Sequence, residues 1–336
     1  MAEPLGMRQR PRIFAISPRT RDVDDYWTDI CKVAAFSETC GLTGVLLFTG
    51  NDTYLEPWAV AHELLRRTAT ISPLVAVNPI YMHPFTVAKI IASLARLHGR
   101  KIYLNMVTGT ALSHQTAMGD RLSHDERYDR LAEYIEIVKT LLGSPRPLSF
   151  AGRYYQTDQL QLYPGVSSDT APEFLLAGQS DAARRVCAAT GSIAMQMLPA
   201  ALEDGLPDIP GIHFGIVARE SEGAAWEAAK SLFPENQEYR AMLEYSMSNT
   251  DAAWKRRMKV DSERGAAAKK GYWLAPFANF QADCPYLVGS HAYIAERLRR
   301  LVQKGVTTFV LDIPAREEEF LNLNRMLHMS GIASSP

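Results

Sequence analysis

The sequence predicts an α/β protein that folds as a (β/α)₈ barrel, the TIM barrel, with insertions. Short apolar runs alternate with longer amphipathic stretches along most of the 336 residues, and eight such alternations can be counted. A compact apolar run is typical of a parallel strand buried on both faces, and an amphipathic stretch is typical of a helix that covers it. Eight β/α units make one barrel of about 250 residues before insertions. No GxGxxG motif follows a strand, which weakens the alternative of a doubly wound open sheet.

Each predicted strand is a short, mostly apolar run. The eight runs are Ile13–Ser17, Gly44–Phe48, Leu74–Val77, Ile102–Met106, Glu173–Ala177, Ile193–Met197, His213–Ala218 and Thr308–Asp312. Helical periodicity follows most of them, over Val23–Cys40, Glu56–Thr68, Phe85–His98, His124–Leu142, Asp181–Ala189, Ser221–Phe233, His291–Lys304 and Glu317–His328. Pro84 at the start of the third helix, and Gly41, Gly99 and Gly143 after helix ends, are ordinary boundary signals.

The residues in excess of a minimal barrel fall into two predicted insertions within one domain over residues 12–336. The first is Ser144–Pro172, and the second is residues 234–289, which we expect to form a lid over the active site because long loops in compact domains are commonly functional. Only fifteen residues, rich in Pro and Gly, separate Met197 from His213, so the sixth crossover should be shortened. Residues 1–11 are predicted to be a flexible N-terminus.

Composition excludes several classes of function. Lys and Arg number 36 against 37 Asp and Glu, a net charge of −1, which argues against nucleic acid or an anionic membrane as the main partner. No window reaches the roughly 18 apolar residues of a membrane span, and the four Cys form no CxxC, so we expect a cytoplasmic protein with reduced thiols. No HxH or HExxH motif and no nucleophile elbow occurs, so we expect neither a metal site nor a catalytic serine.

Polar turns follow the predicted strands at the end where a barrel carries its chemistry. They are Thr49–Tyr54, Asn78–Pro84, Asn105–Thr110 and Gly178–Asp181. These turns hold Asn, Thr, Tyr and His side chains and few carboxylates. Such a site suits a large, partly anionic aromatic ligand but supplies no nucleophile or metal, which is typical of an enzyme whose cofactor carries the chemistry.

The turn over Ala177–Asp181 has two interpretations. Ser180 stands at the expected N-cap of a helix, where exposed N–H groups and the helix dipole can bind a phosphate. Alternatively, Ser180 only caps the helix and Asp181 complements the dipole. Asp181 would repel a phosphate unless its side chain points away, so these residues alone leave both interpretations open.

Several ordered segments resemble the bacterial luciferase-like flavin monooxygenases. The segments are Pro73–Pro79, His83–Ala88, Leu104–Gly109, Gly119-Asp120, His124–Tyr128 and Glu133-Tyr134. The Ala177–Asp181 turn and Leu287–Ser290 resemble the branch that holds pyrimidine oxygenase, alkanesulfonate monooxygenase and the sulfone monooxygenases. The resemblance runs in order from about Ile13 to His328 and covers nearly the whole chain.

The resemblance implies a two-component monooxygenase. A separate NAD(P)H:flavin reductase would supply reduced FMN (FMNH₂), O₂ would be the cosubstrate, and the chain would form a homodimer or higher homo-oligomer. The resemblance places the cofactor against one set of residues. They are Phe48, Thr49 and Asn105 at the ring and ribityl chain, His114, Arg127 and Tyr128 along the cofactor, and Gly178, Gln179 and Ser180 at the phosphate.

Departures from the family pattern bear on the substrate. The Arg residues of the alkanesulfonate enzymes are absent from His213–Ile216 and Phe277–Gln281, and a sulfonate without an Arg partner is costly to bury. A Thr of the pyrimidine enzyme corresponds to about Pro79, which argues against that substrate. The remaining predicted pocket is aromatic and suits an uncharged or amine-bearing small molecule. Its residues are Tyr54, Tyr81, Phe214, Phe277 and Phe280.

Three polar residues are our candidates for substrate orientation or proton transfer, namely Asp52, Asn78 and His213. Two alternatives remain. The chain could be an F420-dependent oxidoreductase of the same superfamily, or a non-catalytic flavin-binding subunit. The sequence names neither the substrate nor the atom type, C, N or S, that would be oxygenated.

Overall fold

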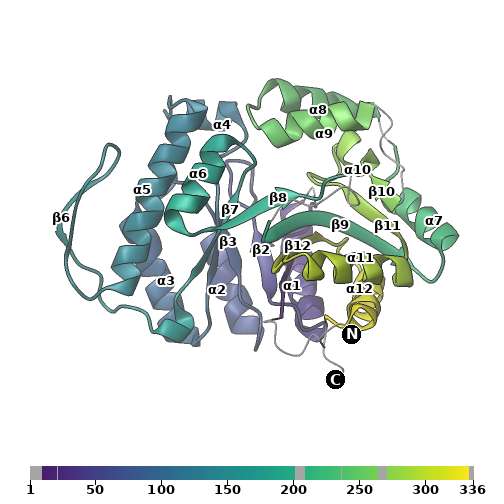
Figure 1. Ribbon diagram of the computed structural model, residues 1–336, viewed down its shortest axis with the longest axis horizontal. Helices are drawn as coiled ribbons and strands as arrows, with labels where there is room; N and C mark the ends of the chain where they lie inside the picture. The colour runs from purple at the N-terminus through teal and green to yellow at the C-terminus, as the bar shows by residue number, and fades with distance from the viewer. Residues whose placement is uncertain (1–9, 21, 201–208, 236, 264–270, 333–336) are drawn as a thin grey trace.

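Eight parallel strands form a closed barrel in the computed structural model, which describes residues 10–20, 22–200, 209–235, 237–263 and 271–332. The barrel strands are β1 (Arg12–Ile16), β2 (Gly44–Leu47), β3 (Leu74–Val77), β4 (Tyr103–Met106), β7 (Glu173–Ala177), β8 (Ile193–Met197), β9 (Gly211–Arg219) and β12 (Thr308–Asp312). Neighbouring strands follow the order β12, β1, β2, β3, β4, β7, β8, β9. The barrel closes because β9 pairs with both β8 and β12 (Figure 1). The predicted fold class is confirmed.

Alternation along the strands separates two cores. Phe14 and Ile16 of β1 belong to the apolar cluster inside the barrel, whereas Ile13 and Ala15 pack in the larger cluster between the strands and the helices. Successive strand side chains point to opposite faces, so each barrel strand serves both cores. This double burial explains why the strands are continuous apolar runs rather than alternating ones.

Helices surround the barrel. They are α1 (Val23–Thr39), α2 (Pro57–Arg67), α3 (Pro84–His98), α4 (Leu112–Ala117), α5 (His124–Gly143), α6 (Asp181–Thr190), α7 (Glu222–Leu232), α11 (His291–Gln303) and α12 (Glu317–Ser330). Most match the predicted helices to within two residues at each end, and the six-residue α4 is an addition. Among the described residues, no helix is long and apolar enough to cross a membrane.

The first insertion forms a hairpin, β5 (Leu148–Ala151) with β6 (Gln156–Leu160), followed by a short 3₁₀ turn at Ser168–Thr170. The hairpin projects from the edge of the molecule beside α5 and away from β9 (Figure 1).

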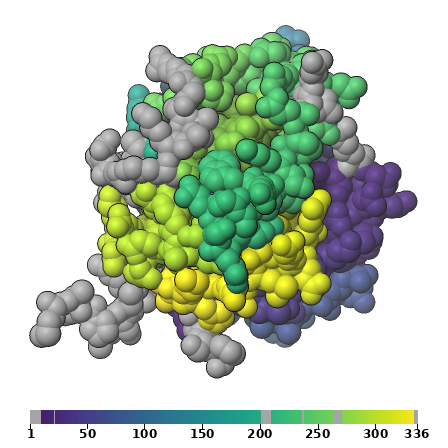
Figure 2. Space-filling model, turned by 90° about the vertical axis from the view of Figure 1, so that its right-hand side faces the viewer, coloured from purple at the N-terminus to yellow at the C-terminus, as the bar shows by residue number. Residues whose placement is uncertain are grey.

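The described part of the second insertion holds three α-helices, one of them a single turn, and two strands. They are α8 (Gln237–Ser248), α9 (Ala253–Glu263), β10 (Tyr272–Trp273), the single turn α10 (Ala275–Ala278) and β11 (Tyr286–Ser290). Strand β11 lies parallel to the outer half of β9, from Gly215 to Arg219, so the predicted insertion ends in a strand of the main sheet. Helix α7 packs over this extension and lies in front of α11 and α12 in Figure 2.

Two predicted features fall partly outside the described residues. The connection from β8 to β9, the predicted shortened sixth crossover, spans only residues 198–210, of which 201–208 lie outside the described residues. Of the predicted N-terminal segment, only Arg10 and Pro11 belong to the described part of the chain.

Candidate functional site

Two adjoining cavities lie at the carboxyl ends of the barrel strands. The one within the barrel mouth, here the barrel cavity, measures about 240 Å³, and the one outside it, here the rim cavity, measures about 510 Å³. The two share walls formed by Phe48, Thr49, Val107, Gly109, Thr110 and Asp283. Residues from α8 line the rim cavity, and residues that lead into α9 line the barrel cavity, so the second insertion contributes walls to both.

The barrel cavity brings together most of the residues predicted to hold a cofactor. Its walls include Phe48, Thr49, Asn105, Tyr128, Gly178, Gln179 and Ser180, together with His213. Asn105 lies two positions after Tyr103, a member of the interior cluster, so both side chains point into the barrel. Residues from β4 and β9, from the turns after β2 and β7, and from α5 therefore converge on one space.

The turn after β7 has the geometry of a capped helix start. The N–H of Ala183 donates to Oγ of Ser180 at 3.2 Å, which confirms the capping role. The Asp181 side chain is 79 % exposed and pairs with Arg184, so it points away from the cavity. Asp181 would therefore not repel a phosphate bound at this turn. Phosphate binding itself stays a prediction.

Tyr128 packs tightly against this turn. A Cβ on Gly178 would lie 2.4 Å from the Tyr128 hydroxyl, so only glycine fits at that position. Burial raises the pKa of Tyr128, and hydrogen bonding to Thr108 and Ser180 opposes the rise. Tyr128 therefore stays protonated at neutral pH and offers the cavity a neutral hydroxyl.

Arg127 does not line either cavity, contrary to its predicted cofactor contact. Its buried guanidinium forms an ion pair with Asp251 and donates to the backbone oxygen of Leu122 at 3.2 Å. Arg127 and Tyr128 are adjacent on α5, where neighbouring side chains point about 100° apart, so one reaches the cavity and the other does not. Asp251 itself lines the barrel cavity.

His213 faces the barrel cavity, whereas its neighbour Phe214 does not face either cavity. The Nε2 atom of His213 is buried and has no hydrogen-bond partner among the described residues. Burial and the nearby charge of Arg19 lower the pKa of His213 to about 4, against the smaller opposing effect of Asp283. His213 is therefore neutral at pH 7.

Phe214 and Phe277, predicted for the substrate pocket, are both corrected by the structure. Phe214 points outward from β9 into the core and packs edge-to-face against Phe309. The reason is strand alternation, since His213 takes the inward direction. Phe277 lies on the short turn α10, fully buried in the same core.

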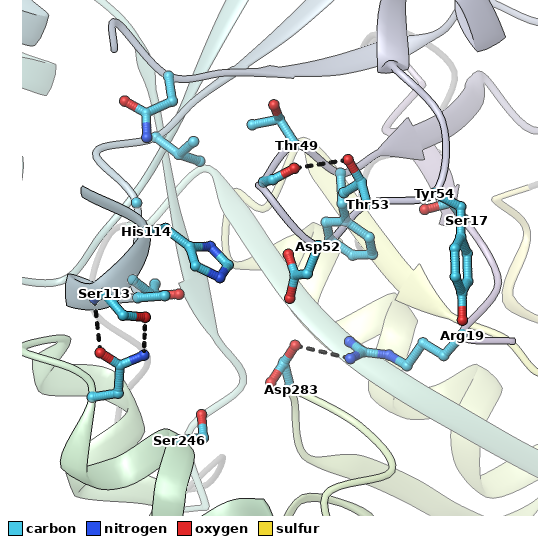
Figure 3. A pocket seen from close by; sticks show the side chains of 18 of the residues that line it. Ser17, Arg19, Thr49, Asp52, Thr53, Tyr54, Ser113, His114, Ser246 and Asp283 are labelled. Carbon is cyan, nitrogen blue, oxygen red and sulfur yellow. Dashed lines mark hydrogen bonds and ion pairs between the residues drawn. The ribbon is translucent and has the colours of Figure 1, made fainter. Parts of the chain in front are cut away.

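The rim cavity contains the other predicted residues, namely Asp52, Asn78, Tyr54, Tyr81, Phe280 and His114. His114, on α4, lines this cavity and not the barrel cavity, and of the predicted cofactor residues only Phe48 and Thr49 share the rim cavity with it. Asp52 and His114 point into the same space in Figure 3. The Tyr81 hydroxyl donates to Oδ1 of Asn51 at 2.6 Å, which braces the turn that carries Asp52.

Sequence reasoning missed a charged cluster between the cavities. Nη1 of Arg19 lies 2.8 Å from Oδ2 of Asp283, and Nζ of Lys255 lies 3.9 Å from its Oδ1. Desolvation opposes the charge of the half-buried Asp283, but Arg19 chiefly and then Lys255 lower its pKa to about 2. Arg19 and Asp283 are 264 positions apart, so no local pattern could have revealed the pair.

Other missed residues line the barrel cavity, namely His124, Gln196, Asp251 and Trp254. His124 lies three positions before Arg127 and four before Tyr128 on α5, and this closeness in sequence was the available signal. Within the described ranges, no three His, Cys, Asp or Glu side chains gather in a group that could hold a metal ion.

Comparison with known proteins adds the family. The family model described as luciferase-like monooxygenase matches residues 12–308. The chain is similar to 4-(gamma-L-glutamylamino)butanoyl-[BtrI acyl-carrier protein] monooxygenase BtrO of Niallia circulans, with 28 % identity over 316 residues. The aligned region covers 90 % of this chain and 91 % of BtrO.

Solved structures share the fold at low identity. EDTA monooxygenase (EmoA) from Chelativorans sp. BNC1 superposes with a TM-score of 0.69 at 17 % identity and covers 97 % of this chain and 95 % of EmoA. An F420-dependent secondary alcohol dehydrogenase superposes with a TM-score of 0.64 at 14 % identity, over 96 % of this chain and 99 % of the dehydrogenase.

Proposed function

This chain belongs to the luciferase-like monooxygenase family, which makes it a flavin-dependent monooxygenase, and we propose that it uses reduced FMN and O₂ to oxygenate a small organic substrate. A separate NAD(P)H:flavin reductase would supply the FMNH₂. We place the flavin in the barrel cavity and the substrate in the rim cavity. The observation that carries the proposal is the convergence of Asn105, Tyr128 and the Ser180 turn on one cavity.

The residues of the barrel cavity fit FMN chemically. The N-terminus of α6 with Ser180 suits the phosphate, because its N–H groups and the helix dipole favour an anion. The net charge of −1 supplies no long-range attraction, so the phosphate must be bound by such local groups. Asn105 and Thr49 supply hydrogen-bonding groups for the ribityl chain and ring, and Phe48 and Met195 supply apolar surface. When bound, reduced FMN would supply the electrons that activate O₂.

Three side chains of the protein would take part in proton transfer or substrate orientation. His213 is neutral with a free Nε2, so it can accept a proton or a hydrogen bond at that atom. Asn78 lies in the rim-cavity wall, and its Oδ1 accepts from the N–H of Ile80 at 3.3 Å, which leaves its Nδ2 to orient a substrate. Asp52 would orient the substrate from the opposite turn.

The second insertion would exclude water. Asn249 of the α8–α9 connection joins α4 through two hydrogen bonds, in which the N–H of Ser113 donates to its Oδ1 at 2.8 Å and its Nδ2 donates to Oγ of Ser113 at 2.7 Å. These contacts hold the insertion beside the mouth of both cavities. We propose that it acts as a lid during turnover, and that the enzyme works in the cytoplasm as a homodimer or higher homo-oligomer.

Anaerobic titration with reduced FMN tests the central claim. We expect binding in the micromolar range, with reduced F420 as the matched competitor, and oxidation of bound FMNH₂ only after O₂ is admitted. Tight binding of reduced F420 and no FMNH₂ binding would instead favour the F420-dependent alternative, whose fold this chain shares. If FMNH₂ binds saturably but no compound in a metabolite screen is oxygenated, the result would favour the alternative of a non-catalytic flavin-binding subunit.

A further inference from the structure

The carboxylate of Asp52 lines the rim cavity and has no partner in the described part of the chain. No hydrogen bond or ion pair joins it to any other described residue, although it lines the cavity wall. Its Oδ1 lies above Gly50, where a Cβ would come within 2.8 Å of it. In Figure 3 the side chain points into the open space between His114 and Asp283.

The Arg and Lys side chains that line the same cavity in the described part of the chain, Arg19 and Lys255, already lie beside carboxylates. Arg19 contacts Asp283 at 2.8 Å and Asp312 at 3.7 Å. Nζ of Lys255 donates to Oγ of Ser246 at 3.0 Å and lies 3.9 Å from Asp283. An anionic ligand would therefore have to displace Asp283 from both cations. A cationic ligand would find Asp52 free.

Aromatic side chains line the same cavity as Asp52. Tyr54, Tyr245 and Phe280 all line the rim cavity and are 44 %, 68 % and 38 % exposed. Phe280 lines the cavity from a left-handed backbone conformation with φ of 51°, which is uncommon for a bulky residue. Aromatic faces attract ammonium groups and tolerate their alkyl carbons.

We propose that the rim cavity binds a protonated amine, with Asp52 as the counter-ion and Tyr54 and Phe280 as flanking rings. This inference rests on the proposed function, because it assigns the substrate of that site to organic ammonium compounds. An ammonium group carries three N–H donors and no acceptor, so it suits a carboxylate that no protein donor occupies.

Binding of three matched probes to the full-length protein tests the proposal. The probes are 2-phenylethylammonium, 2-phenylethanol and 3-phenylpropanoate, measured by titration calorimetry at pH 7 and low ionic strength. We expect the ammonium compound to bind at least about tenfold more tightly than the alcohol, and the carboxylate not to bind. Equal affinity for alcohol and ammonium, or tighter binding of the carboxylate, would overturn the proposal.

Variants connect the preference to its residues. Asp52→Asn should reduce the preference for ammonium to about twofold or less, while Asp169→Asn, an exposed carboxylate outside both cavities, should leave it unchanged. Asp283→Asn should remove the carboxylate that Arg19 and Lys255 share, leave Arg19 with Asp312 alone, and allow 3-phenylpropanoate to bind. An unchanged preference in Asp52→Asn would refute the role of that carboxylate.

The outcome is separable from that of the proposed function. FMNH₂ binding depends on the barrel cavity, and the probe preference depends on the rim cavity, so each is measured without the other. Retained FMNH₂ affinity in Asp52→Asn also serves as the check that this variant is folded.

Discussion

The buried guanidinium of Arg127, at the start of α5, forms an ion pair with the carboxylate of Asp251, which lines the barrel cavity at the entry to α9. The two residues are 124 positions apart and belong to the barrel and to the second insertion. The pair therefore joins the insertion to the barrel beside Tyr128. Its two members differ in burial, since the Arg127 side chain is 3 % exposed and that of Asp251 is 25 % exposed.

This difference predicts unequal costs for the two single substitutions. Asp251→Asn leaves the buried Arg127 charge without a counter-ion and should lower the free energy of unfolding by about 2–3 kcal/mol. Arg127→Met leaves only the partly solvated Asp251 and should cost about 1 kcal/mol. Urea unfolding of both single variants and of the double variant measures these free energies of unfolding. A larger loss of stability in Arg127→Met than in Asp251→Asn would contradict the prediction.

Replacement of Ser180 separates phosphate binding from helix capping. Asp caps helices about as well as Ser, so Ser180→Asp should leave the stability within about 0.5 kcal/mol. Its negative charge should repel the FMN phosphate and weaken FMNH₂ binding by at least about tenfold. The matched control is Ser221→Asp at the cap of α7, where Ser221 accepts from the N–H of Ala224 at 3.2 Å, far in sequence from the cavity turn. Unchanged FMNH₂ affinity in Ser180→Asp would show that Ser180 caps α6 and does not bind the phosphate.

Gly178 tests the packing of the phosphate turn. In Gly178→Ala the new methyl would meet the Tyr128 hydroxyl at 2.4 Å and Cβ of Ala183 at 2.8 Å, so the turn or Tyr128 must move. We expect a loss of about 1–3 kcal/mol in stability together with weaker FMNH₂ binding. The control Gly223→Ala on α7 meets no atom within 4 Å and should instead stabilise the helix by about 0.5–1 kcal/mol. Thermal unfolding and anaerobic titration measure the two effects.

The lowered pKa of His213 predicts a pH dependence of stability. The folded state holds this group neutral down to about pH 4, whereas the unfolded chain binds the proton near 6.5. Between these values the unfolded state binds more protons, so stability falls as pH decreases from about 6.5 to 4. From pH 7 to 5 the wild type should lose about 2 kcal/mol more than His213→Gln. Equal losses in the two proteins would show that His213 is not protected from protonation.

The sequence was sufficient for the barrel because both signals that define it are local. Each strand, such as Leu74–Val77, is buried on both faces and so is apolar throughout, and each helix, such as α5, repeats its apolar residues with helical spacing. The turns after the strands were found for the same reason, since the carboxyl end of a parallel strand is where a barrel gathers its polar residues.

Side-chain direction was harder to predict than position along the chain. Phe214 follows His213 and Arg127 precedes Tyr128, and in each pair only one residue reaches the barrel cavity. A strict use of strand alternation would have separated the first pair. The second depends on how α5 is rotated against the barrel, which is decided by packing.

The sequence by itself determined the fold class, the order of the β/α units, the family resemblance and the presence of a capped turn after the fifth barrel strand. Tertiary structure alone decided that Arg19, Lys255 and Asp283 meet between two cavities, and that no other described residue pairs with Asp52. Periodicity and capping depend on residues a few positions apart. The charge balance of a cavity depends on groups brought together from distant loops, and chain closure into a barrel is what places them within reach of one another.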